Sequence, residues 1–84
     1  MTDTRTVGFI DIGTNSIHLL VSRFFPGSLG TPIFHDRESV RLGQNLFSQG
    51  FIDEETIEKT RLVIANFSRA AKEMGADEIM ALAT

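Results

Sequence analysis

Residues 7–21 read VGFIDIGTNSIHLLV, and a short polar segment interrupts two apolar ones within this stretch. The first apolar segment, 7–12, is apolar at both alternating positions except at Asp11, which indicates a strand covered on both faces. The second, 17–25, fits another largely buried strand. Residues 13–16 between them have the composition of a turn, because glycine and asparagine tolerate left-handed backbone conformations. The stretch therefore predicts a hairpin that begins a sheet.

The segments that follow extend this hairpin. Residues 26–30 form a second break, rich in proline and glycine, and 33–40 is expected to form a third strand, whose polar composition places it near an edge. Two short connections in succession indicate an antiparallel meander. Residues 41–51 contain two glycines and are expected to form a loop. A last apolar segment, 78–83, is expected to be a short strand.

A long helix is predicted between the loop and the last strand. Asp53 is expected to cap its N-terminus, and Glu54 and Glu55 lie in the first turn, where the helix dipole favours negative charge. Gly75 is expected to end the helix in the left-handed conformation. The expected buried face, with steps of three or four residues, consists of Ile57, Thr60, Ile64, Phe67, Ala71 and Met74.

A strand, a helix and another strand in this order predict a right-handed crossover, which places 78–83 parallel to 7–12. The expected architecture is an α/β fold with a three-stranded antiparallel meander, one crossover helix and a fourth strand parallel to the first. One helix covers only one face of such a sheet. The other face is therefore expected to be an apolar surface that promotes self-association, and residues 1–84 are expected to form a single partial domain.

The composition narrows the class of protein. The chain has 84 residues, a net charge of -3 and no cysteine, so it contains neither a disulfide framework nor a thiolate zinc site. The absence of a basic surplus argues against nucleic acid as a partner. No apolar run approaches the roughly 20 residues of a membrane span, so no membrane association is expected. We expect a cytoplasmic location.

The polar segment of the opening stretch has the composition of an anion-binding loop. Gly13 permits close approach of the backbone to a ligand, and Thr14, Asn15 and Ser16 offer side-chain and backbone donors. Asp11, at the end of an apolar strand, is costly to bury unless it is paired or binds a cation such as Mg²⁺. The alternative is that Asp11 accepts hydrogen bonds across a hairpin and the glycine only turns the chain. These residues alone leave both interpretations open.

Other polar residues are weaker candidates. Arg41 is suited to binding an anion because its guanidinium matches phosphate oxygens, but an ion pair with Glu38 or Asp36 is the alternative. His18 and His35 lie in the second and third expected strands without an acidic or cysteine partner at ligand spacing. They are therefore expected to be structural.

The stretch GFIDIGTNSIHLLV (8–21) resembles the first phosphate motif of the actin-like ATPase superfamily. Together with SVRLGQNL (39–46) and residues 50–84, it resembles the amino-terminal part of the exopolyphosphatase and guanosine pentaphosphate phosphohydrolase family. This resemblance implies part of a ribonuclease-H-like domain. It also implies release of terminal phosphate from polyphosphate or guanosine pentaphosphate with Mg²⁺ or another divalent cation.

The resemblance also implies roles for individual residues. Asp11 would lie near the metal, and residues 13–16 would line the phosphate loop. Arg41 is a weak candidate, since Glu38 stands where the family often has a basic residue. The family's catalytic glutamate and second phosphate motif follow the segment that corresponds to Thr84, so no catalytic residue is expected within this chain. The alternatives are a phosphate- or nucleotide-binding piece of a related kinase or chaperone-like ATPase, and a non-catalytic assembly module.

Overall fold

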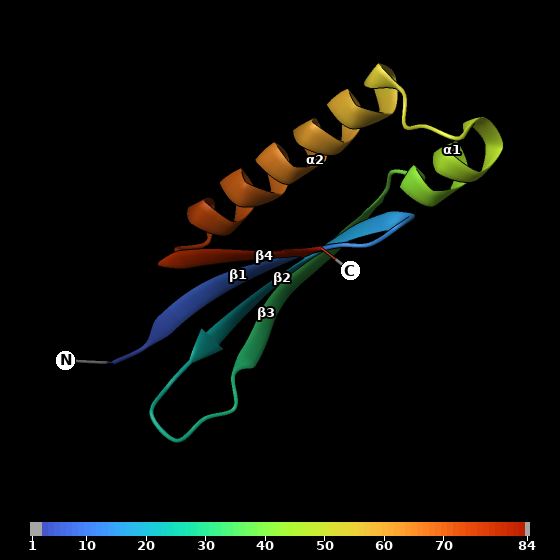
Figure 1. The fold of residues 1–84 in the computed structure, drawn as a ribbon. Coiled ribbons are helices and arrows are strands. Elements are labelled where there is room, and N and C mark those ends of the chain that lie inside the picture. The colour runs from blue at the N-terminus through green and yellow to red at the C-terminus, as the bar shows by residue number, and fades with distance from the viewer. Residues whose placement is uncertain (1–2, 84) are drawn as a thin grey trace.

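A computed structural model describes residues 3–83 as one four-stranded sheet with two helices (Figure 1). The elements in chain order are β1 (Arg5–Ile12), β2 (Ser16–Phe24), β3 (Thr31–Ser39), α1 (Leu42–Gln49), α2 (Glu54–Glu73) and β4 (Glu78–Ala83). The strand order is β3-β2-β1-β4, with β2 antiparallel to both of its neighbours and β4 parallel to β1. The predicted meander, the parallel fourth strand and the edge position of β3 are confirmed.

The hydrophobic core lies between the sheet and α2. In the β1–β2 ladder, Ile10 is opposite Leu19 and Ile12 is opposite Ile17, so alternate residues of both strands point to the same side. The helix contributes three buried residues to this core. The buried cluster consists of Ile10, Ile17, Leu19, Val21, Val40, Val63, Phe67 and Ala71. The cluster members outside α2 belong to β1 and β2, apart from Val40, which follows β3. The core therefore forms mainly over the first two strands.

The capping signals predicted for α2 are confirmed. Asp53 precedes the helix, and its Oδ1 accepts a hydrogen bond of 2.8 Å from the backbone N–H of Thr56. Hydrogen bonds from Thr56, and one from Gln49, hold the pKa of the Asp53 carboxyl below its ordinary value of 3.8. At the other end Gly75 has a φ of 87°, the left-handed conformation that glycine adopts without strain.

The predicted buried face of α2 is wrong at its beginning. Ile57 is 54% exposed, whereas Val63, which was not assigned to this face, is buried together with Phe67 and Ala71. The N-terminal end of α2 lies beyond the strands, next to α1 (Figure 1), so its first turns have no sheet to pack against. Periodicity indicates which side of a helix is apolar, but the position of the helix over the sheet decides which turns are buried.

The loop predicted over residues 41–51 is also wrong, because most of it forms α1. Gly50 ends this helix with a φ of 78° and donates its N–H to the carbonyl of Leu46. It is thus a C-terminal cap rather than part of a loop. Gly43, in the first turn, lies against Thr14 and Asn15. The two glycines that suggested a loop therefore serve the end of a helix and its contact with the first hairpin, and the chain has a second helix.

The side of the sheet opposite α2, which we call the open face, has no helix over it within residues 3–83 (Figure 1). Its apolar residues include Phe9, Leu20, Met80 and Leu82, and the last two are 46% and 58% exposed. Asp11 lies on the same face and is exposed. The cost of burying its carboxylate, which the sequence suggested, therefore does not arise in this structure.

Neither helix described by the structure has the combined length and hydrophobicity needed to cross a bilayer. The cytoplasmic location stays a prediction from the sequence.

Candidate phosphate-binding site

The turn between β1 and β2 is closed by a hydrogen bond of 2.9 Å from the N–H of Gly13 to the carbonyl of Ser16. The sequence assigns Gly13 and Asn15 to a turn because both tolerate left-handed backbone conformations. Neither residue adopts a positive φ, so this reason is wrong. Glycine is required here for space instead, because a Cβ on Gly13 would lie 3.1 Å from the carbonyl oxygen of Ser16. The turn is tight because its two ends, Gly13 and Ser16, lie close together.

The carbonyl groups of this turn are used by the segment that joins β3 to α1. The carbonyl of Asn15 accepts hydrogen bonds from the N–H groups of Val40 (2.8 Å) and Arg41 (3.1 Å), and that of Thr14 accepts one of 2.6 Å from Gly43. The N–H groups of Thr14 and Asn15 have no acceptor within residues 3–83. Two consecutive free N–H groups in a tight turn form the kind of concavity that binds anions.

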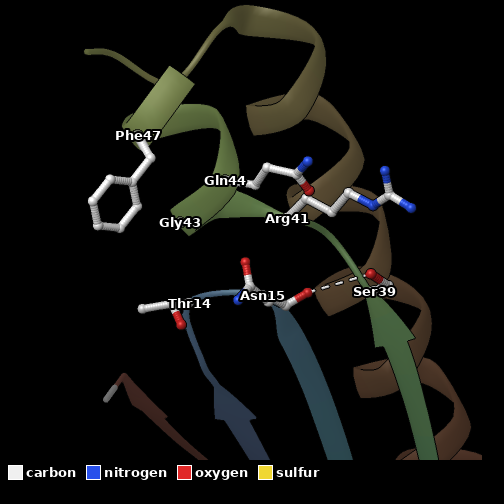
Figure 2. Close-up of a pocket in the computed structure, with 7 residues that line it drawn as sticks. All are labelled: Thr14, Asn15, Ser39, Arg41, Gly43, Gln44 and Phe47. Carbon is white, nitrogen blue, oxygen red and sulfur yellow. Dashed lines mark hydrogen bonds between the residues drawn. The ribbon is translucent and has the colours of Figure 1, made fainter. Parts of the chain in front are cut away.

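A cavity of about 530 Å³ adjoins these groups, between the turn and the first half of α1. It is lined by Thr14, Asn15, Ser39, Arg41, Gly43, Gln44 and Phe47. Figure 2 shows Thr14 and Asn15 facing the first turn of α1, with the Phe47 ring and the Arg41 side chain on opposite sides. Arg41 is the charged residue in this lining, and the other polar groups are hydroxyls and amides. The cavity therefore favours an anion.

Arg41 is the residue immediately before α1 and has left-handed backbone angles, with a φ of 56° and a ψ of 39°. Its N–H bond to Asn15 holds the backbone in place. Its guanidinium has no ion pair with Glu38 or Asp36, the two partners that the sequence offered as the alternative. That alternative is not realised among the described residues, and the charge of Arg41 is available to a ligand.

The beginning of α1 adds to the positive character of the cavity. No side chain caps this end, and no acidic residue lies in the first turn. The first N–H groups of a helix carry partial positive charge unless a cap or a ligand satisfies them. Of these groups, the N–H of Gly43 is already bound to Thr14. Gln44 lines the cavity and adds an amide side chain to the same wall.

The structure brings together only some of the residues predicted for the site. Thr14, Asn15 and Arg41 line the cavity, whereas Asp11 and Ser16 do not. The Oγ of Ser16 accepts a hydrogen bond of 3.4 Å from Arg37. Gly13 lines a neighbouring, more apolar hollow of about 260 Å³, which reaches β4 at Ala83. The predicted roles of all these residues remain predictions.

The surroundings of Asp11 fit a cation that has few protein ligands. Its exposed carboxylate has neither an ion pair nor a side-chain hydrogen bond among the residues described. No group of three His, Cys, Asp or Glu side chains gathers around a common point in residues 3–83. Mg²⁺ is commonly held by one or two carboxylates together with water and substrate phosphates. A single carboxylate is therefore sufficient if phosphate supplies further oxygens.

Sequence reasoning assigned no role to Ser39, Gln44 or Phe47. Gly43 was noted only as one of the two glycines of the expected loop and as part of the segment SVRLGQNL at residues 39–46. Gly43, Gln44 and Phe47 are brought to the turn by α1, which the sequence analysis interpreted as a loop, whereas Ser39 is the last residue of β3. An alternative reading of Gly50 as a helix cap would have revealed the helix, since residues 42–49 contain no proline and end at a glycine.

The fold and the site define a class of protein. A β3-β2-β1-β4 sheet with β4 parallel to β1 and a crossover helix between them is part of the actin-like ATPase fold. The structure matches the Ppx/GppA protein of Aquifex aeolicus with a TM-score of 0.85, at 25% identity over 95% of this chain. It matches an exopolyphosphatase of Cytophaga hutchinsonii with a TM-score of 0.80, at 25% identity over 94% of this chain.

The sequence comparison agrees with the structural one. Over 78 residues, 93% of this chain, it is 32% identical to exopolyphosphatase 1 of Mycobacterium leprae and 33% identical to exopolyphosphatase 1 of Mycobacterium tuberculosis. No family model matches the chain. The resemblance inferred from the sequence is confirmed: the chain is related to the exopolyphosphatases. It spans about a quarter of the length of these relatives, 23% of the mycobacterial proteins and 26% of the Aquifex protein.

Proposed function

We propose that this chain supplies the first phosphate-binding loop of a phosphohydrolase that releases terminal phosphate from polyphosphate or guanosine pentaphosphate. The observation that carries the proposal is the pair of free N–H groups at Thr14 and Asn15, which adjoin a cavity whose charged residue is Arg41. The names of the related exopolyphosphatases support polyphosphate as the substrate class. Guanosine pentaphosphate rests on the family resemblance of the sequence.

The chemistry of phosphate release explains why such a loop is useful. Phosphoryl transfer depends mainly on positioning and on stabilising negative charge at the phosphate oxygens. Backbone N–H groups and a guanidinium can do both without a nucleophile or a base. The attacking water also needs a residue that orients it, and we assign no residue of this chain to that role. The chain therefore contributes binding and electrostatic stabilisation.

We also propose Asp11 as the residue that would hold Mg²⁺ or another divalent cation, directly or through water. A bound divalent cation would neutralise charge on the phosphate oxygens. The support is the exposed, unpaired carboxylate of Asp11. This residue is the second-to-last of β1, and the turn to β2 begins after Ile12. Its position outside the cavity lining means that a phosphate chain would have to extend from the turn toward β1 to share the cation.

The proposal is tested by titrating inorganic tripolyphosphate into the chain by calorimetry, with and without Mg²⁺. Arg41→Gln is expected to weaken binding by about tenfold, or 1.4 kcal/mol. The matched control is Arg69→Gln, because Arg69 is a helix residue whose side chain bonds Asn66, far from the cavity lining. Equal affinity of the two variants would exclude Arg41 from the site. Loss of the Mg²⁺ effect in Asp11→Asn, but not in Arg41→Gln, would support the role of Asp11.

Two alternative functions are distinguished by the same titration. A nucleotide-binding piece of a kinase or chaperone-like ATPase would bind ATP more tightly than tripolyphosphate, because it would recognise the nucleoside as well. A non-catalytic assembly module would bind neither. The assembly alternative has an observation of its own, the exposure of Met80 and Leu82 on the open face. We propose that the chain self-associates through this face, which does not conflict with phosphate binding.

A further inference from the structure

The two histidines of the chain, His18 and His35, are brought together by the β2–β3 pairing. His18 is opposite Arg37 in the ladder and His35 is opposite Leu20, so the imidazoles lie diagonally on the open face. Their ring centroids are 5.6 Å apart with 36° between the ring planes. The Nδ1 atom of His18 is 3.4 Å from the Nε2 atom of His35. This contact was not predicted, because the two residues are 17 positions apart in the chain.

The separation of these two nitrogens is informative. The two rings are in hydrogen-bond contact at 3.4 Å. This contact is longer than the roughly 2.9–3.0 Å that is usual for a hydrogen bond from nitrogen, so a metal ion can replace it at little cost. Two imidazole nitrogens on one tetrahedral Zn²⁺, each about 2.05 Å from the metal, are separated by about 3.3 Å. Two ligands at right angles, as in square-planar Cu²⁺, would be only about 2.9 Å apart. The observed distance matches the tetrahedral case.

The surroundings permit a cation at this position. His35 is exposed and His18 is half-buried, so an ion can reach both without unfolding the sheet. Two charged groups flank His18 in the ladder, the carboxylate of Asp11 on β1 and the guanidinium of Arg37 on β3. Arg37 donates to the Oγ of Ser16, which lies two residues from His18 on the side away from His35. The negative charge of Asp11 and the positive charge of Arg37 offset each other near the two histidines.

We propose that His18 Nδ1 and His35 Nε2 together bind one Zn²⁺ ion, with water completing a tetrahedral site. Imidazole is a good ligand for Zn²⁺, whereas Mg²⁺ prefers oxygen. The histidine pair is therefore a transition-metal site separate from the phosphate loop and from the cation proposed at Asp11. The proposal does not depend on the proposed phosphate site, since it uses neither Arg41 nor the turn residues. It does use the open face, through which we also propose self-association, so the metal titration is done at a concentration at which the chain is monomeric.

The test is a calorimetric titration of the chain, without a histidine tag, with Zn²⁺ at about pH 7.5, where free imidazole is mostly neutral. One Zn²⁺ per chain is expected. His18→Gln and His35→Gln should each weaken Zn²⁺ binding about tenfold or more. Two imidazoles held on the same sheet bind one ion more tightly than a single imidazole does, and each variant leaves only one. The control variant Glu73→Gln, which removes a carboxylate from the last turn of α2, should keep both the stoichiometry and the affinity. The imidazole proton resonances of both histidines should shift together in the wild-type chain.

Three results would overturn the proposal. Two weak sites per chain, with each single variant losing one site and keeping the affinity of the other, would show independent histidines. Undiminished binding in the double variant would place the metal on carboxylates. A Zn²⁺-dependent increase in sedimentation coefficient, with half a metal per chain, would show that the histidines of two molecules share the ion. Circular dichroism of the variants verifies that the sheet is retained, and both substitutions are on the accessible face.

Discussion

Gly8 in β1 lies so close to α2 that a Cβ at this position would stand 2.9 Å from the Cβ of Ala71. Ala71 is fully buried, and a second neighbour, the Cγ1 of Ile79 in β4, would be 3.7 Å away. The crossover helix can therefore pack closely against β1 only because one residue has no side chain and the other has a single methyl group. This contact fixes the distance between the helix and the sheet.

Gly8→Ala is accordingly expected to lower the free energy of unfolding by about 1–3 kcal/mol, the usual cost of an extra methyl in a packed core. The measurement is chemical denaturation followed by circular dichroism. Adding Ala71→Gly to this variant moves the methyl from the helix to the strand and should restore part of the loss. Simple additivity of the two substitutions would show that the pair is not in the contact described.

A second close approach joins the turn between β1 and β2 to α1. Gly43 donates its N–H to the carbonyl of Thr14, and a Cβ on Gly43 would lie 3.3 Å from both the Thr14 Cβ and the Asn15 Oδ1. Gly43→Val should push α1 away from the turn and weaken tripolyphosphate binding about tenfold, or 1.4 kcal/mol. Ser48→Val, which places the same side chain at an exposed position of α1, serves as the control. Equal loss in both variants would indicate a general effect on the helix.

The cap of α2 makes a small part of the stability depend on pH. The pKa of Asp53 is lower in the folded chain than its ordinary value of 3.8, because Thr56 and Gln49 donate hydrogen bonds to it. A carboxyl with a lowered folded pKa stabilises the fold above its ordinary pKa, and this contribution is lost as the pH falls through the folded pKa. Thermal unfolding of the wild type should therefore lose stability below pH 3.8 relative to Asp53→Asn.

Asparagine is the matched replacement because its side-chain oxygen still accepts from the Thr56 N–H but does not titrate in this range. Above about pH 5 the difference between the two proteins should be constant. A gain in wild-type stability on acidification, relative to the variant, would contradict the assigned direction.

The proposed self-association predicts a specific effect on the open face. Leu82→Lys places a charge among Phe9, Met80 and the other exposed apolar residues of that face, and it should shift the chain toward the monomer. The measurement is sedimentation velocity over a range of concentrations. Leu62→Lys is the control, since Leu62 is a similarly exposed leucine on α2. A wild-type chain that stays monomeric at high concentration would refute self-association.

Much of the fold follows from local patterns in the sequence. The apolar run at residues 7–12, the polar turn after it and the cap residues Asp53 and Gly75 each predicted an element that the structure contains. The parallel position of β4 followed from the handedness of crossover connections. The helix at 42–49 was missed because both of its glycines were interpreted as loop residues. Gly50 has the local role of a C-terminal cap, whereas the role of Gly43 depends on a distant contact. Gly43 contacts the turn at Thr14, and no local propensity contains that information.

The candidate site divides in the same way. The sequence by itself determined the chemistry of the turn, since residues 13–16 carry the glycine and the polar groups that an anion needs, and it determined the resemblance to exopolyphosphatases. Only the tertiary structure decided which groups meet. In the folded chain the carbonyls of Asn15 and Thr14 accept hydrogen bonds from Arg41 and Gly43, while the N–H groups of the same two turn residues stay free. Asp11 lies outside the cavity lining, and His18 contacts His35. The physical reason is that hydrogen bonds and strand register join residues far apart in the chain, and these pairings are properties of the folded sheet.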